Sequence, residues 1–122
     1  MDFNCYYYKI RIVDVIDGDS LRIDIDMGFE HWIVNQNVRL YGLNTPEIRT
    51  KDLYEKELGL KVKAWVESKV ATNGEYAIME SYYDKSGKYG RILGTFWLKN
   101  AEGEYYNLNE MMLSEGLAEI YH

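Results

Sequence analysis

Residues 9–27 read KIRIVDVIDGDSLRIDIDM, and this stretch decides the fold. On both sides of its central DGDS segment, apolar and charged residues alternate with a period of two, as in a β-strand that buries one face. The segment at 17–20 has the composition of a hairpin turn, so the stretch predicts two paired strands. The residues expected on the buried face are Ile10, Ile12, Leu21, Ile23, Ile25 and Met27.

Further along the chain the pattern changes between strand and helix. The elements expected there are a strand, a helix, two strands and a short helix, at residues 31–43, 52–70, 76–82, 92–98 and 108–115. Pro46 ends the third strand, Asn73-Gly74 ends the long helix, and Gly116 ends the last one. The long helix is expected to turn one apolar stripe towards the core. The residues of this stripe are Leu58, Val62, Trp65, Val66 and Val70. Five strands and two helices predict an α+β fold, which a small Greek-key barrel would satisfy among other arrangements.

The size and composition of the chain indicate one domain, residues 1–122. A chain of 122 residues with 47% hydrophobic content can bury one core. Cys5 is the only cysteine, which excludes an internal disulfide. The first 20 residues contain no unbroken apolar stretch, so neither a signal peptide nor a membrane span is expected. We therefore expect a cytoplasmic protein without a membrane partner.

The net charge of −6 is unfavourable for binding a polyanion, but its distribution is uneven. Residues 101–122 contain five Glu and no Lys, Arg or Asp, which leaves a net charge of −1 on residues 1–100. The distribution predicts weak, salt-sensitive binding to any nucleic acid.

Three separated polar clusters, at residues 17–20, 39–47 and 85–91, contain the residue types that a metal-assisted phosphodiesterase needs. Carboxylates on a tight turn can hold a hard cation, a lone Glu can activate water, and arginines can grip a phosphate. A hairpin turn alone also explains Asp17-Gly18. The adjacent Asp19 and the Asn44-Thr45 pair favour the cation site as well, and both interpretations stay open at this point.

In these clusters the chain resembles the staphylococcal nuclease-like, or thermonuclease, domain family. The family's elements are an Asp-Gly-Asp turn, an Arg-to-Thr-Pro-Glu segment and a Lys-Tyr-Gly-Arg segment, which appear here at 17–19, 39–47 and 88–91. Residues 108–112 and 116–118 are similar to its final helix, so the resemblance extends over about residues 9–121. It implies a five-stranded Greek-key barrel of the oligonucleotide-binding type, with a helix after the third strand and a C-terminal helix.

The resemblance also implies a metal site. It assigns Asp19, the side chain of Asn44 and the backbone carbonyl of Thr45 to the ion, with Asp17 as a neighbour behind these ligands. Ca²⁺ is the expected ion and Mg²⁺ the other candidate. The best-known members of the family have Asp where this chain has Asn44, so one anionic ligand becomes neutral. We therefore expect weaker cation affinity and an altered preference between the two ions.

The remaining site residues are likewise implied by the resemblance. Glu47 matches the family's catalytic carboxylate, and Arg39 and Arg91 match its two phosphate-binding arginines. Lys88 and Tyr89 match positions that contact a neighbouring phosphate of the substrate.

The resemblance therefore implies a cation-dependent nuclease of low sequence specificity that leaves 3′-phosphate ends. Its expected substrates are DNA, RNA or both, preferentially single-stranded or frayed, and we expect it to act as a monomer. The alternative is a nuclease-like barrel that has lost activity and binds nucleic acid or protein. A generic barrel scaffold would leave the three clusters unexplained.

Overall fold

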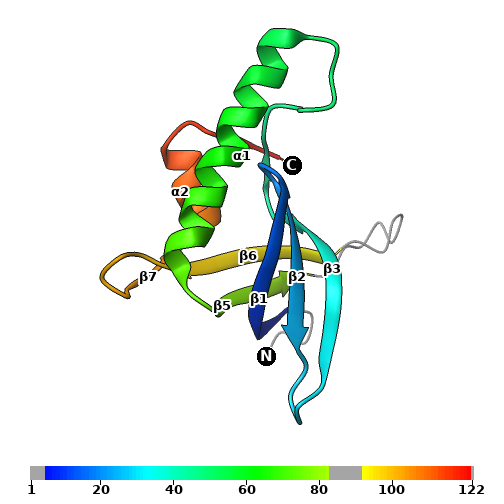
Figure 1. The fold of residues 1–122 in the computed structure, drawn as a ribbon, viewed down its shortest axis with the longest axis vertical. Helices are drawn as coiled ribbons and strands as arrows, with labels where there is room; N and C mark the ends of the chain where they lie inside the picture. The colour runs from blue at the N-terminus through cyan, green and yellow to red at the C-terminus, as the bar shows by residue number, and fades with distance from the viewer. Residues whose placement is uncertain (1–4, 83–91, 122) are drawn as a thin grey trace.

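Strands β1, β2, β3, β5 and β6 surround the core in the computed structural model, which describes residues 5–82 and 92–121 (Figure 1). The elements within these residues are, in chain order, β1 (Cys5–Asp17), β2 (Ser20–Asp26), β3 (Trp32–Leu40), β4 (Leu43–Asn44), α1 (Leu53–Asn73), β5 (Ala77–Tyr82), β6 (Ile92–Lys99), β7 (Tyr105–Asn107), α2 (Leu108–Ser114) and β8 (Glu119–Ile120).

The strands of the main sheet follow the order β3-β2-β1-β5-β6-β7, and β3 also pairs with β6. This additional pairing closes five strands into a barrel. It is parallel, whereas the other pairings in the sheet are antiparallel. β4 and β8 form a separate two-stranded sheet. The expected α+β barrel of the oligonucleotide-binding type is confirmed.

The alternation in residues 9–27 places most of the predicted face in the core. Ile10, Leu21, Ile23 and Ile25 are buried. Met27, predicted to join them, is 45% exposed. β2 ends one residue earlier because the Asp26 carboxylate accepts the Gly28 amide at 2.8 Å and starts a turn. The period-two pattern therefore does not apply at Met27.

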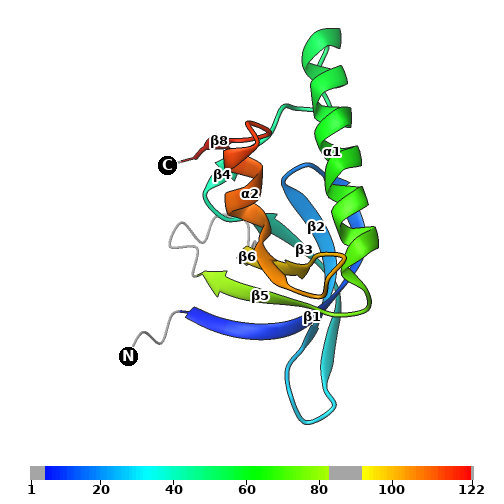
Figure 2. The same cartoon turned by 90° about the vertical axis from the view of Figure 1, so that its left-hand side faces the viewer.

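Helix α1 lies against the barrel and begins beyond the ends of the strands (Figures 1 and 2). Val62 and Val66 of the predicted apolar stripe are buried. Asp52 caps its start by accepting the amides of Tyr54 and Glu55. The helix extends three residues past the predicted apolar stripe and ends at Asn73-Gly74, as predicted. The buried side chain of Asn73 accepts the amide of Lys99 at 2.9 Å. α1 is thus fixed to the barrel at its C-terminal end while its first turn projects outward.

Helix α2 closes the other part of the core and is one residue shorter than predicted. Its Asn109 is 5% exposed, and its side chain forms hydrogen bonds with three backbone groups, two in β6 and one just after β3. It accepts the amide of Phe96 and donates to the carbonyls of Tyr41 and Gly94. This side chain connects α2 to β6 and to the segment after β3, which carries the predicted site residues.

The sequence analysis did not separate β4 from the third strand and missed β7 and β8. Each of these strands has two or three residues, too few to establish a period. No helix within residues 5–82 and 92–121 has the length and apolar character needed to cross a membrane.

Candidate metal and phosphate site

The turn between β1 and β2 carries the two predicted carboxylates. Asp17 and Ser20 pair across its ends. The amide of Asp19 donates to Asp17 Oδ1 at 3.1 Å, which is the local bond expected of an Asp in a turn. Asp19 itself is only 8% exposed. Asp17 therefore stabilises the turn, and Asp19 presents a nearly buried carboxylate to the segments that pack against it.

Gly18 is required at this turn by space. A Cβ at this position would lie 2.7 Å from Val62 Cγ1 on α1 and 2.9 Å from Thr45 Oγ1. Gly18 is absent from the positive-φ residues of the described chain, so the conformational reason that turn preferences suggest does not apply here. The missing side chain instead lets the turn approach both α1 and Thr45.

Arg39 links the turn to the end of the third strand. The β2–β3 register places it opposite Ser20, and its neighbours in β3 are buried, so its side chain leaves the core as the alternation predicts. Its Nη2 lies 3.6 Å from Asp19 Oδ2 and donates to Asn44 Oδ1 and to the carbonyl of Leu43. Asp19 from the β1–β2 turn and Asn44 from β4 thus direct oxygens at one cationic group.

The carboxyl group of Asp19 is electrostatically unusual. Burial, and after it the hydrogen bond and negative charge of Asp17, raise its pKa from 3.8 to about 6. Arg39 and the amide of Thr45, which donates to Asp19 Oδ2 at 3.3 Å, lower the pKa but do not offset the burial. The ionised form is therefore only partly compensated by the protein.

The oxygens gathered here have the chemistry of a hard-cation site. Ca²⁺ and Mg²⁺ take carboxylate and amide oxygens, backbone carbonyls and water. Among the described residues, no group of three or more His, Cys, Asp and Glu side chains could hold a metal. Asp19 and Asn44 fit a mixed oxygen site with neutral ligands, and the amide of Thr45 orients Asp19.

Glu47 projects from the loop between β4 and α1, and the helix holds the backbone of this loop. The Glu47 amide donates to Glu55 Oε1 at 3.3 Å. A Cβ on Gly59 would lie 2.7 Å from the Pro46 carbonyl oxygen and 3.1 Å from that of Glu47. The loop backbone therefore lies directly on α1 at Gly59, while the Glu47 side chain stays exposed.

One cavity of about 510 Å³ brings together predicted residues from the β1–β2 turn, β3 and the loop before α1, but not Asn44 or Thr45. Asp17, Asp19, Arg39 and Glu47 line it. The cavity also has two cationic lining residues that the sequence analysis did not identify, Arg49 and Lys63. Neither belongs to a motif, and only the packing of α1 against the β1–β2 turn shows that Lys63 faces the same space.

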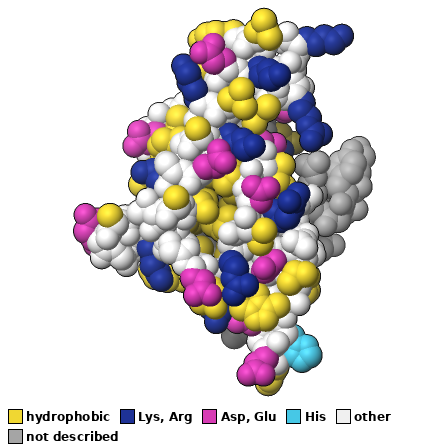
Figure 3. Space-filling model, in the orientation of Figure 1, with side chains coloured by type: hydrophobic (Ala, Val, Ile, Leu, Met, Phe, Trp, Pro, Cys, Tyr) yellow, Lys and Arg dark blue, Asp and Glu magenta, His cyan; other side chains and the backbone are white. Residues whose placement is uncertain are grey.

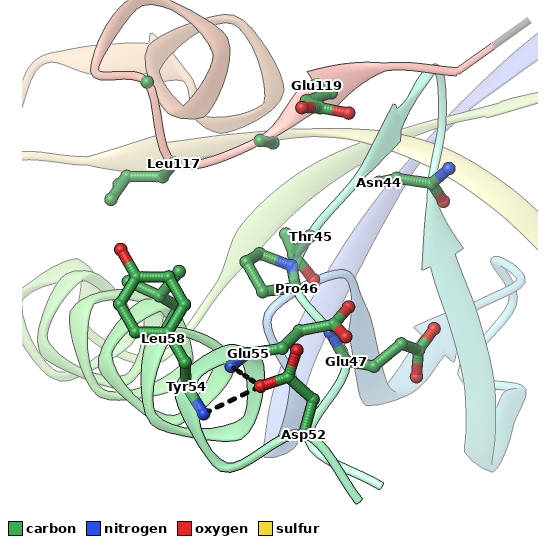
Figure 4. Close-up of a pocket in the computed structure, with 12 residues that line it drawn as sticks. Asn44, Thr45, Pro46, Glu47, Asp52, Tyr54, Glu55, Leu58, Leu117 and Glu119 are labelled. Atoms are coloured by element: carbon green, nitrogen blue, oxygen red, sulfur yellow. Dashed lines mark hydrogen bonds between the residues drawn. The ribbon is translucent and has the colours of Figure 1, made fainter. Parts of the chain in front are cut away.

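A neighbouring cavity of about 550 Å³ lies on the other side of Glu47. Asn44 and Thr45 line it together with the start of α1 and the segment around β8 (Figure 4). Its ionisable lining residues are all acidic: Glu47, Asp52, Glu55 and Glu119. Glu47 thus separates a strongly acidic cavity from one in which acidic and basic side chains are mixed.

Arg91, Lys88 and Tyr89 lie outside the described residues, so the structure does not place these three predictions. The described part of β6 begins at Ile92, which pairs with Val38 of β3.

Tyr121 is an aromatic neighbour of the site to which the sequence analysis assigned no role. Its ring centre lies 5.3 Å from the Arg39 guanidinium carbon, and its amide donates to the carbonyl of Gly42 at 2.9 Å. The β4–β8 pairing brings the end of the chain to this position. Cation–π contact with Tyr121 contributes to the orientation of Arg39.

Comparison with protein families gives one match. The model of a family described as staphylococcal nuclease homologue matches residues 37–122, which include Arg39, Asn44, Thr45 and Glu47. Comparison with curated proteins gives no match.

Proposed function

The chain belongs to the family of staphylococcal nuclease homologues, and from this membership we propose that it is a divalent-cation-dependent nuclease. The observation that most supports the proposal is the cavity shared by Asp19, Arg39 and Glu47. A carboxylate that can hold a cation, a guanidinium that can bind phosphate and a carboxylate that can accept a proton line one space. This combination suits hydrolysis of a phosphodiester bond.

We assign Asp19, Asn44 and the carbonyl of Thr45 to a bound Ca²⁺, or to Mg²⁺, with Asp17 supporting the turn behind them. Such an ion supplies positive charge that polarises a phosphoryl oxygen. The incomplete compensation of the Asp19 charge supports this assignment. Arg39 contacts the oxygens of both Asp19 and Asn44, and when it binds a phosphate it exchanges at least part of these contacts for phosphate oxygens.

Glu47 is assigned to the attacking water. Its carboxylate accepts a proton from the water, whose oxygen forms a bond to phosphorus as the bond from phosphorus to the 5′ oxygen breaks. The 5′ oxygen leaves as a hydroxyl after protonation, and the phosphate remains on the 3′ side. Arg39 and Arg91 bind the phosphoryl oxygens and stabilise the negative charge that develops on them. Lys88 and Tyr89 are assigned to a neighbouring phosphate.

The proposed substrate is DNA, RNA or both, cleaved with low sequence specificity by a monomer. A phosphate of single-stranded or frayed nucleic acid can enter the 510 Å³ cavity more easily than a phosphate of a paired duplex. On the face shown in Figure 3, Lys and Arg side chains are interspersed with Asp and Glu. This distribution and the net charge of −6 favour weak, salt-sensitive binding.

The second candidate function is a nuclease-like module that binds nucleic acid or protein without cleaving it. Asn44 favours this alternative because an amide replaces a carboxylate among the proposed cation ligands and so weakens attraction for the ion. Retention of Glu47 in the shared cavity favours the enzyme, since a binding module has no need for a carboxylate beside the phosphate.

Cleavage of single-stranded DNA and RNA by the purified protein tests the proposal. Parallel reactions contain Ca²⁺, Mg²⁺ or a chelator, and end-labelled products reveal which oxygen retains the phosphate. We expect cation-dependent cleavage that leaves 3′-phosphates and is lost in Glu47→Gln but not in the control Glu67→Gln, an exposed position on α1. Bound but uncleaved substrate under every condition would support the inactive module instead.

A further inference from the structure

Two cationic side chains of the 510 Å³ cavity, one on α1 and one in the loop that precedes it, have no role in the chemistry proposed above. We propose that Lys63 and Arg49 form a second phosphate-binding position, which holds the substrate strand along α1 next to the bond being cleaved. The inference rests on the proposed nuclease function and specifies the substrate as a strand with more than one phosphate. Both residues line the 510 Å³ cavity together with Arg39 and Glu47.

The position of Lys63 is fixed by two close contacts of its helix. Val62, the preceding residue, packs against Gly18 in the β1–β2 turn. Gly59, one helical turn earlier, lies against the backbone of Pro46 and Glu47. Residues four apart share a helix face, so Lys63 follows Gly59 on the side that meets the site. The helix that supports the Glu47 loop therefore also holds this cation at the cavity.

Lys63 and Arg49 remain available for a ligand. Within residues 5–82 and 92–121, neither side chain makes an ion pair, hydrogen bond or cation–π contact, whereas Arg39 is engaged by Asp19 and Asn44. Lys63 is half-buried, which limits competition from water, and Arg49 is exposed at the rim. Unpaired cations beside a phosphate-binding guanidinium attract a second phosphate of the same strand.

The charges of the two cavities determine the direction in which the nucleic-acid strand of the substrate extends from Glu47. The cavity beside β8 has four acidic and no basic lining residues among those described, so it repels phosphate. The other cavity has Arg39, Arg49 and Lys63 against Asp17, Asp19 and Glu47. A divalent cation held by Asp19, Asn44 and Thr45 would make this cavity net positive, whereas the cavity beside β8, with four acidic residues, would stay net negative. The backbone of the substrate is therefore expected to run towards Arg49 and Lys63.

Binding of a single-stranded oligonucleotide tests the inference without requiring cleavage. Fluorescence anisotropy with Ca²⁺ compares Glu47→Gln with the same protein carrying Lys63→Gln or Arg49→Gln. Each added substitution is expected to weaken binding about two- to fivefold at 0.1 M salt. Each should also make the plot of log affinity against log salt concentration less steep, by about 0.7 in slope. This is the value for one phosphate contact on a single-stranded nucleic acid.

Lys61→Gln is the matched control because Lys61 lies on the same helix, pairs with Glu57 at 3.7 Å and does not line the cavity. A dinucleoside monophosphate, which has one phosphate, is the matched ligand, and its affinity should not change in Lys63→Gln. Equal effects of Lys63→Gln and Lys61→Gln on both affinity and salt slope would overturn the inference. Circular dichroism and thermal unfolding check that each variant is folded.

The test separates this inference from the proposed nuclease function. Cleavage by the wild-type protein without any specific effect of Lys63→Gln or Arg49→Gln would leave the nuclease proposal intact and refute the second phosphate position. Absence of cleavage together with specific losses of binding in both variants would support the second phosphate position and refute the nuclease proposal.

Discussion

Replacement of Gly59 by Ala tests whether α1 positions the catalytic loop. The added Cβ would lie 2.7 Å from the Pro46 carbonyl oxygen, and ordinary contact begins at 3.4 Å. The loop or the helix must therefore move by 0.3 Å to reach 3.0 Å, below which such contacts do not occur, and by 0.7 Å to reach an ordinary contact. Because Ile48 Cγ1 and the Glu47 carbonyl oxygen are also within 3.1 Å of the Cβ, movement along the loop does not relieve the contact.

Two opposing effects determine the stability of Gly59→Ala. Alanine is favoured over glycine in a helix by about 1 kcal/mol. Overpacking of a close contact costs about 1–3 kcal/mol. The expected net result is a decrease of about 0–2 kcal/mol in the free energy of unfolding, measurable by thermal or urea denaturation. The Gly59 contacts are therefore expected to outweigh or cancel the gain in helix propensity.

The effect on catalysis should exceed the effect on stability. Relaxation to an ordinary contact displaces the loop by 0.7 Å, which is larger than the roughly 0.5 Å within which a catalytic group must be held. A misplacement of about 1 Å can cost on the order of 100-fold in rate. We expect kcat for oligonucleotide cleavage to fall about tenfold or more in Gly59→Ala. Glu67→Ala, on an exposed part of the same helix, is the control. An increase in thermal stability with unchanged kcat would refute the proposed role of Gly59.

Three further predictions concern charge. Asn44→Asp should strengthen Ca²⁺ binding about tenfold or more by adding an anionic ligand, measured by calorimetry, and unchanged affinity would contradict its place at the ion. Arg39→Lys should lower kcat by about 10²–10³ because the charge remains but the forked donor is lost, and near-normal kcat in steady-state cleavage would contradict its phosphate role. The hydrogen bond from the Gly28 amide and, to a smaller extent, the hydrogen bond and charge of Lys9 hold the pKa of the Asp26 carboxyl below its ordinary value of 3.8. Ionisation of Asp26 therefore favours the folded state. The melting temperature of Asp26→Asn should therefore lie below that of the wild type at neutral pH, and the difference should close as pH falls through the depressed pKa; a gap independent of pH would contradict this.

Local patterns in the sequence predicted the main elements because each pattern extends over several residues. Alternation identified β1 and β2, and the stripe containing Val62 and Val66 identified α1, whose buried residues include both. The prediction failed at Met27, where a side-chain bond from Asp26 begins a turn. The two-residue strands β4 and β8 depend on pairing with each other across the chain, which no local pattern reveals.

The candidate site was predictable only as a set of residue types. The motifs identified Asp19, Arg39 and Glu47, and the structure adds that they line one cavity. The packing reason for Gly18 and the presence of Lys63 in the cavity both depend on where α1 crosses the β1–β2 turn. Such contacts join residues distant in sequence, so hydrophobic periodicity and turn preferences contain no information about them.

Single-turnover cleavage of an end-labelled oligonucleotide by wild-type protein and Glu47→Gln, with saturating Ca²⁺ and parallel binding measurements, tests the nuclease proposal most directly. Loss of the group that accepts the proton from water is expected to lower the rate by about 10²–10⁴ while affinity stays within a few-fold. Equal rates for the two proteins, or binding without cleavage by the wild type, would contradict the assignment of Glu47 as the catalytic carboxylate of a nuclease.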